Sequence, residues 1–108
     1  MKGQRARVLL AVGVVLALVA AAAGQPDVVL MDIQLPDGTG IECTTRLKEI
    51  MPSLQIVVVT VYADADRIFR ALKSGACGYV LKRAKPERII AAIQSANDGD
   101  VPMTPEIA

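Results

Sequence analysis

The segment VVLMDIQLPDGTG (residues 28–40) indicates the fold class, because it leads from a buried strand to a charged residue and then to a turn. Four apolar residues without polar alternation are typical of a strand covered on both faces, as in a parallel sheet between helices. Asp32 follows this run directly, and Pro36, Asp37, Gly38 and Gly40 predict a loop. Ligands of open α/β sheets bind at the carboxyl ends of strands, so Asp32 marks the expected functional edge.

The composition fits one α/β domain and excludes several kinds of site. The chain has 108 residues, of which 53% are hydrophobic, and this is ample for one core. It has no histidine and two cysteines, so a Ser-His-Asp triad, a Cys-His nucleophile and a structural zinc site all lack residues. We expect Cys43 and Cys77 to be reduced packing residues of a cytoplasmic protein.

Charge is distributed unevenly along the chain. Residues 1–26 hold three basic residues and no acid, whereas residues 27–108 hold nine basic and eleven acidic residues. This near balance in the main body gives no electrostatic footprint for nucleic acid, so we expect no direct nucleic-acid binding by this chain.

Three strand–helix units are predicted from residue 28 onward. After the first strand come a helix over residues 41–51, a strand over 54–60, a helix from about Asp64 to Gly75, a strand over 78–81 and a helix from Pro86 to Asn97. The three strands finish on Asp32, Thr60 and Lys82. Because parallel strands align these ends, we expect a phosphoryl site in which Asp32 is the nucleophile and the other two side chains bind phosphoryl oxygens.

Three segments resemble the receiver domain of bacterial two-component response regulators: DVVLMDIQLPDGTG (27–40), VVVTVYAD (57–64) and ALKSGACGYVLK (71–82). The resemblance runs from about Gln25 to Ala108 and implies an α/β, flavodoxin-like three-layer fold with a parallel sheet. It implies that Asp32 accepts a phosphoryl group from a histidine kinase or phosphotransfer protein. It further implies that Thr60 and Lys82 bind this group and that Tyr79 is the switch aromatic.

The sequence departs from the family pattern ahead of residue 27. The family holds Mg²⁺ with an acidic pair at the end of its first strand, and no Asp or Glu precedes Asp27 here. The remaining candidate ligands are Asp32, the backbone carbonyl of Gln34 and Asp37, a small set for this ion. Residues 1–26 are also too few for the family's two preceding strands and helices. We therefore expect a fold that lacks about one strand–helix unit, and impaired phosphorylation.

Residues 8–23, VLLAVGVVLALVAAAA, have three competing interpretations. They form the first strand (8–12) and a crossover helix (14–23), or a membrane or signal segment that would place the protein at the inner membrane, or a misassigned gene start. The tail GDVPMTPEIA (99–108) resembles the linker to a LuxR-type helix-turn-helix output domain. The expected organisation is an apolar segment (1–24), a receiver core (25–97) and a linker (98–108) toward an output domain that this sequence does not contain.

Two other functions compete with the phosphoacceptor. Asp32 with Asp37-Gly38-Thr39 resembles haloacid-dehalogenase-type phosphatases, but their second Asp comes two residues after the first and here it comes five after, so we expect no enzyme. A degenerate, unphosphorylated receiver that serves as an interaction module, with or without a membrane anchor, is the stronger alternative.

The apolar residues of the last helix predict a surface through which the protein binds a partner. If the first strand runs by one crossover to the Asp32 strand, its helix lies on the face away from the last helix. The apolar surface beside Ile89, Ile90 and Ile93 is then incompletely covered, which predicts self-association through this helix.

Overall fold

The computed structural model describes residues 8–10, 26–35 and 38–101. The strands of its main sheet are β1 (Val8–Leu10), β2 (Val28–Met31), β5 (Gln55–Thr60) and β6 (Gly78–Leu81). The helices are α2 (Gly40–Ile50), α3 (Ala65–Lys73) and α4 (Pro86–Asn97). Two short strands, β3 (Gln34–Leu35) and β4 (Gly38–Thr39), pair with each other outside the main sheet.

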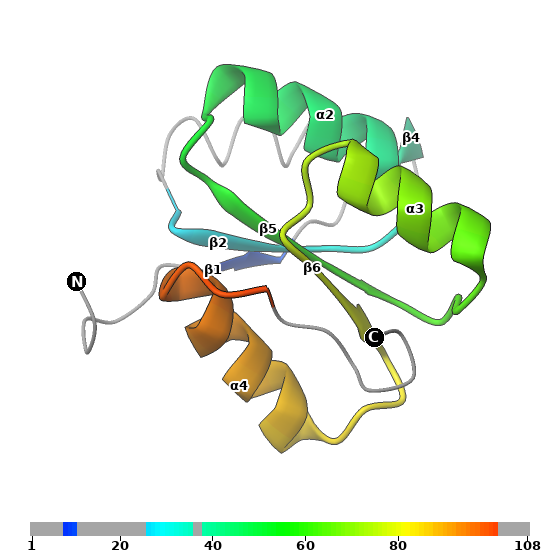
Figure 1. Cartoon of the computed structure of the whole chain (residues 1–108), viewed down its shortest axis with the longest axis vertical. Helices are drawn as coiled ribbons and strands as arrows, with labels where there is room; N and C mark the ends of the chain where they lie inside the picture. Colours follow the sequence, from blue (N-terminus) through cyan, green and yellow to red (C-terminus); the bar gives the residue numbers. More distant parts are fainter. Residues whose placement is uncertain (1–7, 11–25, 36–37, 102–108) are drawn as a thin grey trace.

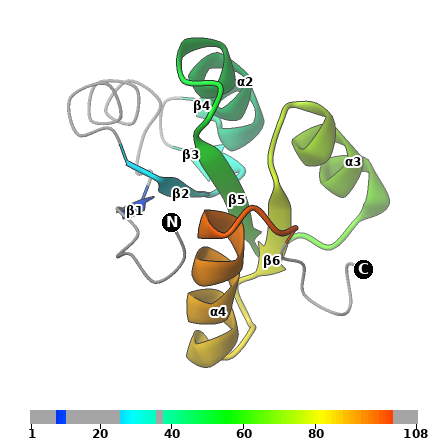
Figure 2. The same cartoon turned by 60° about the vertical axis from the view of Figure 1, so that its left-hand side comes forward.

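The main sheet lies between two layers of helices. Its four strands are all parallel and follow the order β1-β2-β5-β6. Figures 1 and 2 show α2 and α3 on one face of the sheet and α4 on the other. This confirms the expected three-layer α/β fold. The flavodoxin-like order 2-1-3-4-5 has five strands, so the sheet formed by the described residues is one strand short of it.

The N-terminal strand lies next to the Asp32 strand. Val8 pairs with Val28, and Leu10 pairs with Leu30, in parallel register. The sequence predicted a strand over residues 8–12 as one of three interpretations, and the structure describes a strand at Val8–Leu10. The predicted crossover helix over residues 14–23 lies outside the described residues. No helix that the structure describes has the length and apolar character needed to cross a membrane.

The prediction of a loop after Asp32 is wrong at Gly38 and Thr39. These residues form β4, which pairs antiparallel with β3 so that Gln34 lies opposite Thr39. Strands joined by a two-residue connection can satisfy each other's backbone groups, and this explains the extra ladder. Thr39 then caps α2, because its hydroxyl oxygen accepts a hydrogen bond from the Glu42 N–H at 3.1 Å.

The remaining helix boundaries follow the predicted signals closely. Asp64 caps α3 by accepting a hydrogen bond from the Arg67 N–H at 3.1 Å. The chain leaves this helix through Gly75, whose φ of +115° belongs to the left-handed region that glycine tolerates. Pro86 occupies the first turn of α4, where its missing N–H costs nothing.

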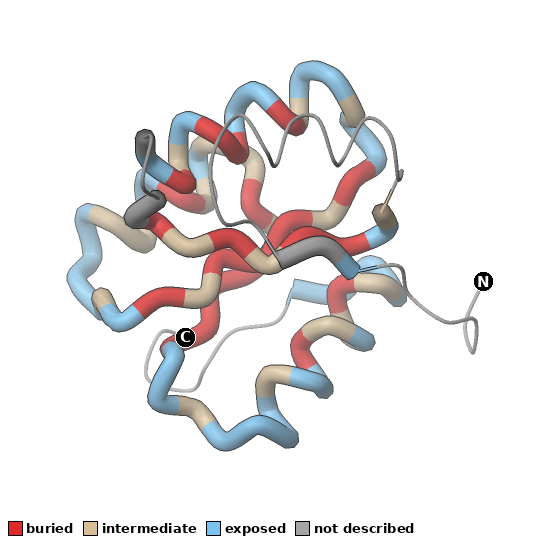
Figure 3. The backbone as a smooth tube through the Cα atoms, turned by 180° about the vertical axis from the view of Figure 1, so that it is seen from behind, coloured by how far each residue is buried: buried red, intermediate tan, exposed pale blue. Residues whose placement is uncertain are grey.

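The core consists of three clusters, two on the face of the sheet that α2 and α3 cover and one on the face that α4 covers. Val29 and Ile56 pack under α2, whereas Val28 and Val57, their strand neighbours, pack under α4. Figure 3 shows that burial is concentrated in the strands and on one side of each helix. The α4 face is less completely covered, because Leu30 and Val59 are only half-buried there.

Both cysteines pack against this core and neither forms a disulfide. Cys43 lies on the buried face of α2, and Cys77 is half-buried on the α4 face of the sheet. Burial raises the pKa of the Cys77 thiol.

Candidate functional site

Three parallel strands end side by side at the predicted functional edge. The pairs Met31 with Val58 and Thr60 with Leu81 fix the register of β2, β5 and β6. Strand β5 lies between β2 and β6, so its last residue, Thr60, belongs to the strand between the one that leads to Asp32 and the one that leads to Lys82. The backbone N–H of Lys82 donates a hydrogen bond to the Thr60 carbonyl at 2.8 Å.

The side chains of Asp32 and Lys82 meet at this edge. The Lys82 Nζ donates a hydrogen bond to Asp32 Oδ2 and forms an ion pair with it. The carboxylate is 26% exposed and the lysine side chain 49% exposed, so the pair remains open to solvent on one side. The expected proximity of the two residues is confirmed. The Lys82 ammonium beside an accessible carboxylate places positive charge at the position where an anionic group would bind.

Gly40 lets α2 approach the backbone of Asp32. The Gly40 N–H donates a hydrogen bond to the Ile33 carbonyl at 2.6 Å. A β-carbon at position 40 would overlap the Asp32 carbonyl oxygen. The sequence showed Gly40 only as a turn signal, because a close approach between distant backbones leaves no local pattern.

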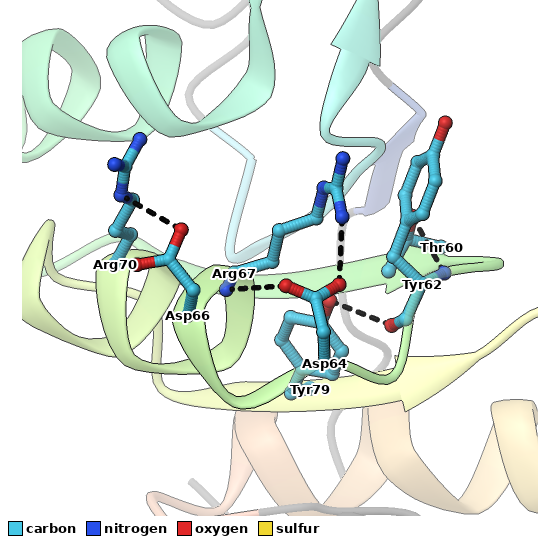
Figure 4. A network of polar contacts seen from close by, with 7 residues as sticks. All are labelled: Thr60, Tyr62, Asp64, Asp66, Arg67, Arg70 and Tyr79. Atoms are coloured by element: carbon cyan, nitrogen blue, oxygen red, sulfur yellow. Dashed lines mark hydrogen bonds and ion pairs between the residues drawn. The ribbon is translucent and has the colours of Figure 1, made fainter.

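Tyr79 is buried, and Figure 4 shows the hydrogen bond that its hydroxyl makes. Its hydroxyl donates a hydrogen bond to the Tyr62 carbonyl at 2.8 Å, and burial raises the pKa of Tyr79 to about 12. The Tyr62 N–H makes a long hydrogen bond, 3.5 Å, to the hydroxyl oxygen of Thr60. Tyr62 therefore connects the predicted phosphoryl ligand on β5 with the predicted switch aromatic on β6.

Arg67 lies over the ring of Tyr62. Its guanidinium carbon is 4.0 Å from the ring centroid, within the range of a cation–π contact. Arg67 also pairs with Asp64 at 2.7 Å, and this hydrogen bond lowers the pKa of the Asp64 carboxyl. Neither Tyr62 nor Arg67 was predicted from the sequence as part of this site. The three-residue spacing of Asp64 and Arg67 in a helical turn was the signal that could have indicated their pairing.

The described donors do not match a Mg²⁺ site. Asp32 contacts Lys82, Gln34 lies in β3, and Asp37 lies outside the described residues. Where the structure describes the chain, no group of three or more His, Cys, Asp or Glu could hold a metal ion. Mg²⁺ requires near-octahedral oxygen ligands, so these residues alone do not fit the ion.

Comparison with known proteins gives a consistent family. A model of the response regulator receiver domain matches residues 3–94. The chain is 37% identical over 84 residues to the oxygen regulatory protein NreC of Staphylococcus carnosus, covering 77% of this chain and 39% of that protein. It is 35% identical over 83 residues to the transcriptional regulatory protein LnrK of Bacillus subtilis, covering 77% and 38%. The chain thus spans less than half the length of these relatives.

Solved structures agree with this result. A two-component response regulator of the LuxR family from Aurantimonas superposes with a TM-score of 0.91 at 25% identity, covering 96% of this chain and 93% of that one. The receiver domain of RcsB from Salmonella enterica, solved with a phosphomimetic, superposes with a TM-score of 0.84 at 17% identity. That match covers 96% of each chain and speaks for the fold alone.

Proposed function

This chain belongs to the response regulator receiver domain family, and on that premise we propose that Asp32 is its phosphoacceptor in a two-component system. The donor is a histidine kinase or a phosphotransfer protein. The observation that carries the proposal is the Lys82 ammonium in contact with the Asp32 carboxylate, with Thr60 at the end of the strand between. The names of the relatives support regulation of transcription as the output of the receiver domain. In this proposal residues 98–108 link the receiver core to a further domain.

The chemistry is a phosphoryl transfer to a carboxylate. An oxygen of Asp32 attacks the phosphorus of a phosphohistidine while the P–N bond breaks. The bonding electron pair stays on the imidazole, which takes a proton from solvent, and an acyl phosphate forms on Asp32. Lys82 and the Thr60 hydroxyl donate hydrogen bonds to the phosphoryl oxygens.

Transfer is slow in this proposal because an anionic nucleophile meets an anionic donor. Members of the family hold Mg²⁺ at the phosphorylation site, and the described residues of this chain lack the carboxylates for it. Lys82 is a cation in contact with Asp32, so it offsets part of the repulsion between the carboxylate and the anionic donor.

A second candidate function follows from the same donor set. With the Asp32–Lys82 ion pair in place and no described acidic cluster beside it, the domain could act unphosphorylated, as an interaction module. The pair would then be a permanent structural contact.

Incubation with acetyl phosphate, with and without Mg²⁺, separates the two functions by intact-protein mass spectrometry. If the domain is a phosphoacceptor, the wild type slowly gains one phosphoryl group and the Asp32→Asn variant gains none. The control variant Asp98→Asn, which changes an exposed aspartate at the end of α4, gains the group as the wild type does. No gain after prolonged incubation would contradict the phosphoacceptor and favour the interaction module.

A further inference from the structure

We infer that Arg67 is a positioning residue for the Thr60 hydroxyl and acts through Tyr62. The inference rests on the proposed role of Thr60 as a ligand of the phosphoryl group. Figure 4 shows the residues involved, which come from the end of β5, the following loop, the first turn of α3 and strand β6.

Tyr62 is held at three points. Its N–H donates to the hydroxyl oxygen of Thr60 at 3.5 Å, and its carbonyl accepts from the Tyr79 hydroxyl at 2.8 Å. Its ring lies under the guanidinium of Arg67 at 4.0 Å. Thr60 and Tyr79 are fully buried, so the first two contacts anchor the loop backbone to the core. The third contact joins the Tyr62 ring to the surface of α3.

The hydrogen bond from the Tyr62 N–H determines where the Thr60 hydroxyl can donate its own proton. A threonine hydroxyl offers one donor and two acceptor positions. When the Tyr62 N–H occupies an acceptor position, the hydroxyl proton is directed elsewhere and can be donated to an anion. A phosphoryl oxygen needs such a donor, so the Tyr62 backbone prepares Thr60 for the group that Asp32 would receive.

Arg67 is itself fixed in place over the ring. Asp64 accepts a hydrogen bond from its guanidinium at 2.7 Å and another from its backbone N–H at 3.1 Å. The second bond caps α3 and does not depend on the Arg67 side chain. A change confined to the guanidinium therefore releases the Tyr62 ring and leaves the helix cap intact.

The same helix supplies a matched control. Arg70 pairs with Asp66 at 3.3 Å, also on the surface of α3, and Figure 4 shows it on the opposite side of this group of residues from Tyr62. Arg67→Met and Arg70→Met each remove one guanidinium and one ion pair from α3. Only the first removes a cation from the face of an aromatic ring.

The experiment measures hydrogen exchange of the Tyr62 amide and binding of beryllofluoride, a phosphoryl mimic, in the full chain. We expect Arg67→Met to speed exchange and to weaken beryllofluoride binding by about two- to fivefold, the range of an exposed cation–π contact. Arg70→Met should match the wild type in both measurements. Arg67→Lys should recover part of the loss, since an ammonium also binds the ring face.

A double-mutant cycle with Tyr62→Leu shows whether the ring transmits the effect. Tyr62→Leu should reproduce Arg67→Met, and combining the two should add little, because both remove the same contact. Equal exchange rates in Arg67→Met and Arg70→Met would overturn the inference. Wild-type protein that fails to bind beryllofluoride would instead contradict the proposed function, while the exchange rates would still decide the role of Arg67.

Discussion

The α-carbon of Gly40 lies against the backbone carbonyl of Asp32, so closely that a β-carbon on residue 40 would overlap the carbonyl oxygen. Backbone cannot move aside as a flexible side chain can. We expect Gly40→Ala to lower the free energy of unfolding by about 3 kcal/mol, the upper part of the usual range for overpacking. Urea unfolding measures this loss.

Gly99→Ala is the control for that substitution. Gly99 has a φ of +88°, and a β-carbon there would meet nothing within 4 Å. Its replacement should cost only about 1 kcal/mol, from backbone strain. Equal losses in the two variants would show that the approach of Gly40 to Asp32 is not tight.

Thr44 carries a buried hydroxyl on α2 with no hydrogen-bond partner among the described residues. Valine has nearly the same shape and removes the unsatisfied group. We therefore expect Thr44→Val to leave the free energy of unfolding unchanged or to raise it by up to about 2 kcal/mol. Thr45→Val, which removes an exposed hydroxyl bonded to the Ile41 carbonyl at 3.2 Å, should give no such gain. A clear loss of stability in Thr44→Val would contradict this account.

Tyr79 should make stability depend on pH in the alkaline range. Its pKa in the folded protein is about 12, above the ordinary value of 10.0, because burial disfavours the phenolate. The unfolded chain therefore loses the proton first. The contribution of Tyr79 is fully present below pH 10 and is lost as the pH rises from about 10 to about 12.

Ultraviolet titration of Tyr62→Phe measures this pKa, since the chain has two tyrosines and only Tyr79 then remains. The phenylalanine ring keeps a face for Arg67. A phenolate signal that appears near pH 10 while the protein is still folded would be incompatible with the buried, hydrogen-bonded hydroxyl.

Ile90 is 58% exposed on α4, the described helix on its face of the sheet. We expect the protein to self-associate through this face, so that its mass in sedimentation velocity rises with concentration. Ile90→Lys should shift it toward monomer. Ile50→Lys, a similarly exposed position on α2 in the opposite layer, should have no effect. A wild-type monomer at all concentrations would exclude this surface as a self-association site.

Local patterns were sufficient to predict most of the fold. The apolar runs ending at Asp32, Thr60 and Lys82 gave the three strands and their common edge, because parallel strands align their ends. Asp64, Gly75 and Pro86 gave helix boundaries, because each satisfies a backbone requirement that depends on near neighbours.

Contacts between distant residues were not predictable in the same way. The overlap that excludes a side chain at Gly40 and the hydrogen bond from Tyr79 to Tyr62 depend on how elements pack. The β3–β4 ladder was missed because Pro36, Asp37 and Gly38 suit an open loop as well as a hairpin. The phosphoryl site of Asp32, Thr60 and Lys82 was predicted from the aligned strand ends, whereas the role of Tyr79 as a switch was predicted from the family resemblance alone.

The central claim is that Asp32 receives the phosphoryl group, and borohydride reduction after incubation with acetyl phosphate tests it most directly. The reagent reduces an aspartyl phosphate to homoserine, which peptide mass spectrometry locates in the chain. We predict homoserine at position 32, dependent on the donor and absent when the donor is omitted. Homoserine at a different aspartate, or phosphorylated protein with intact Asp32, would contradict the claim.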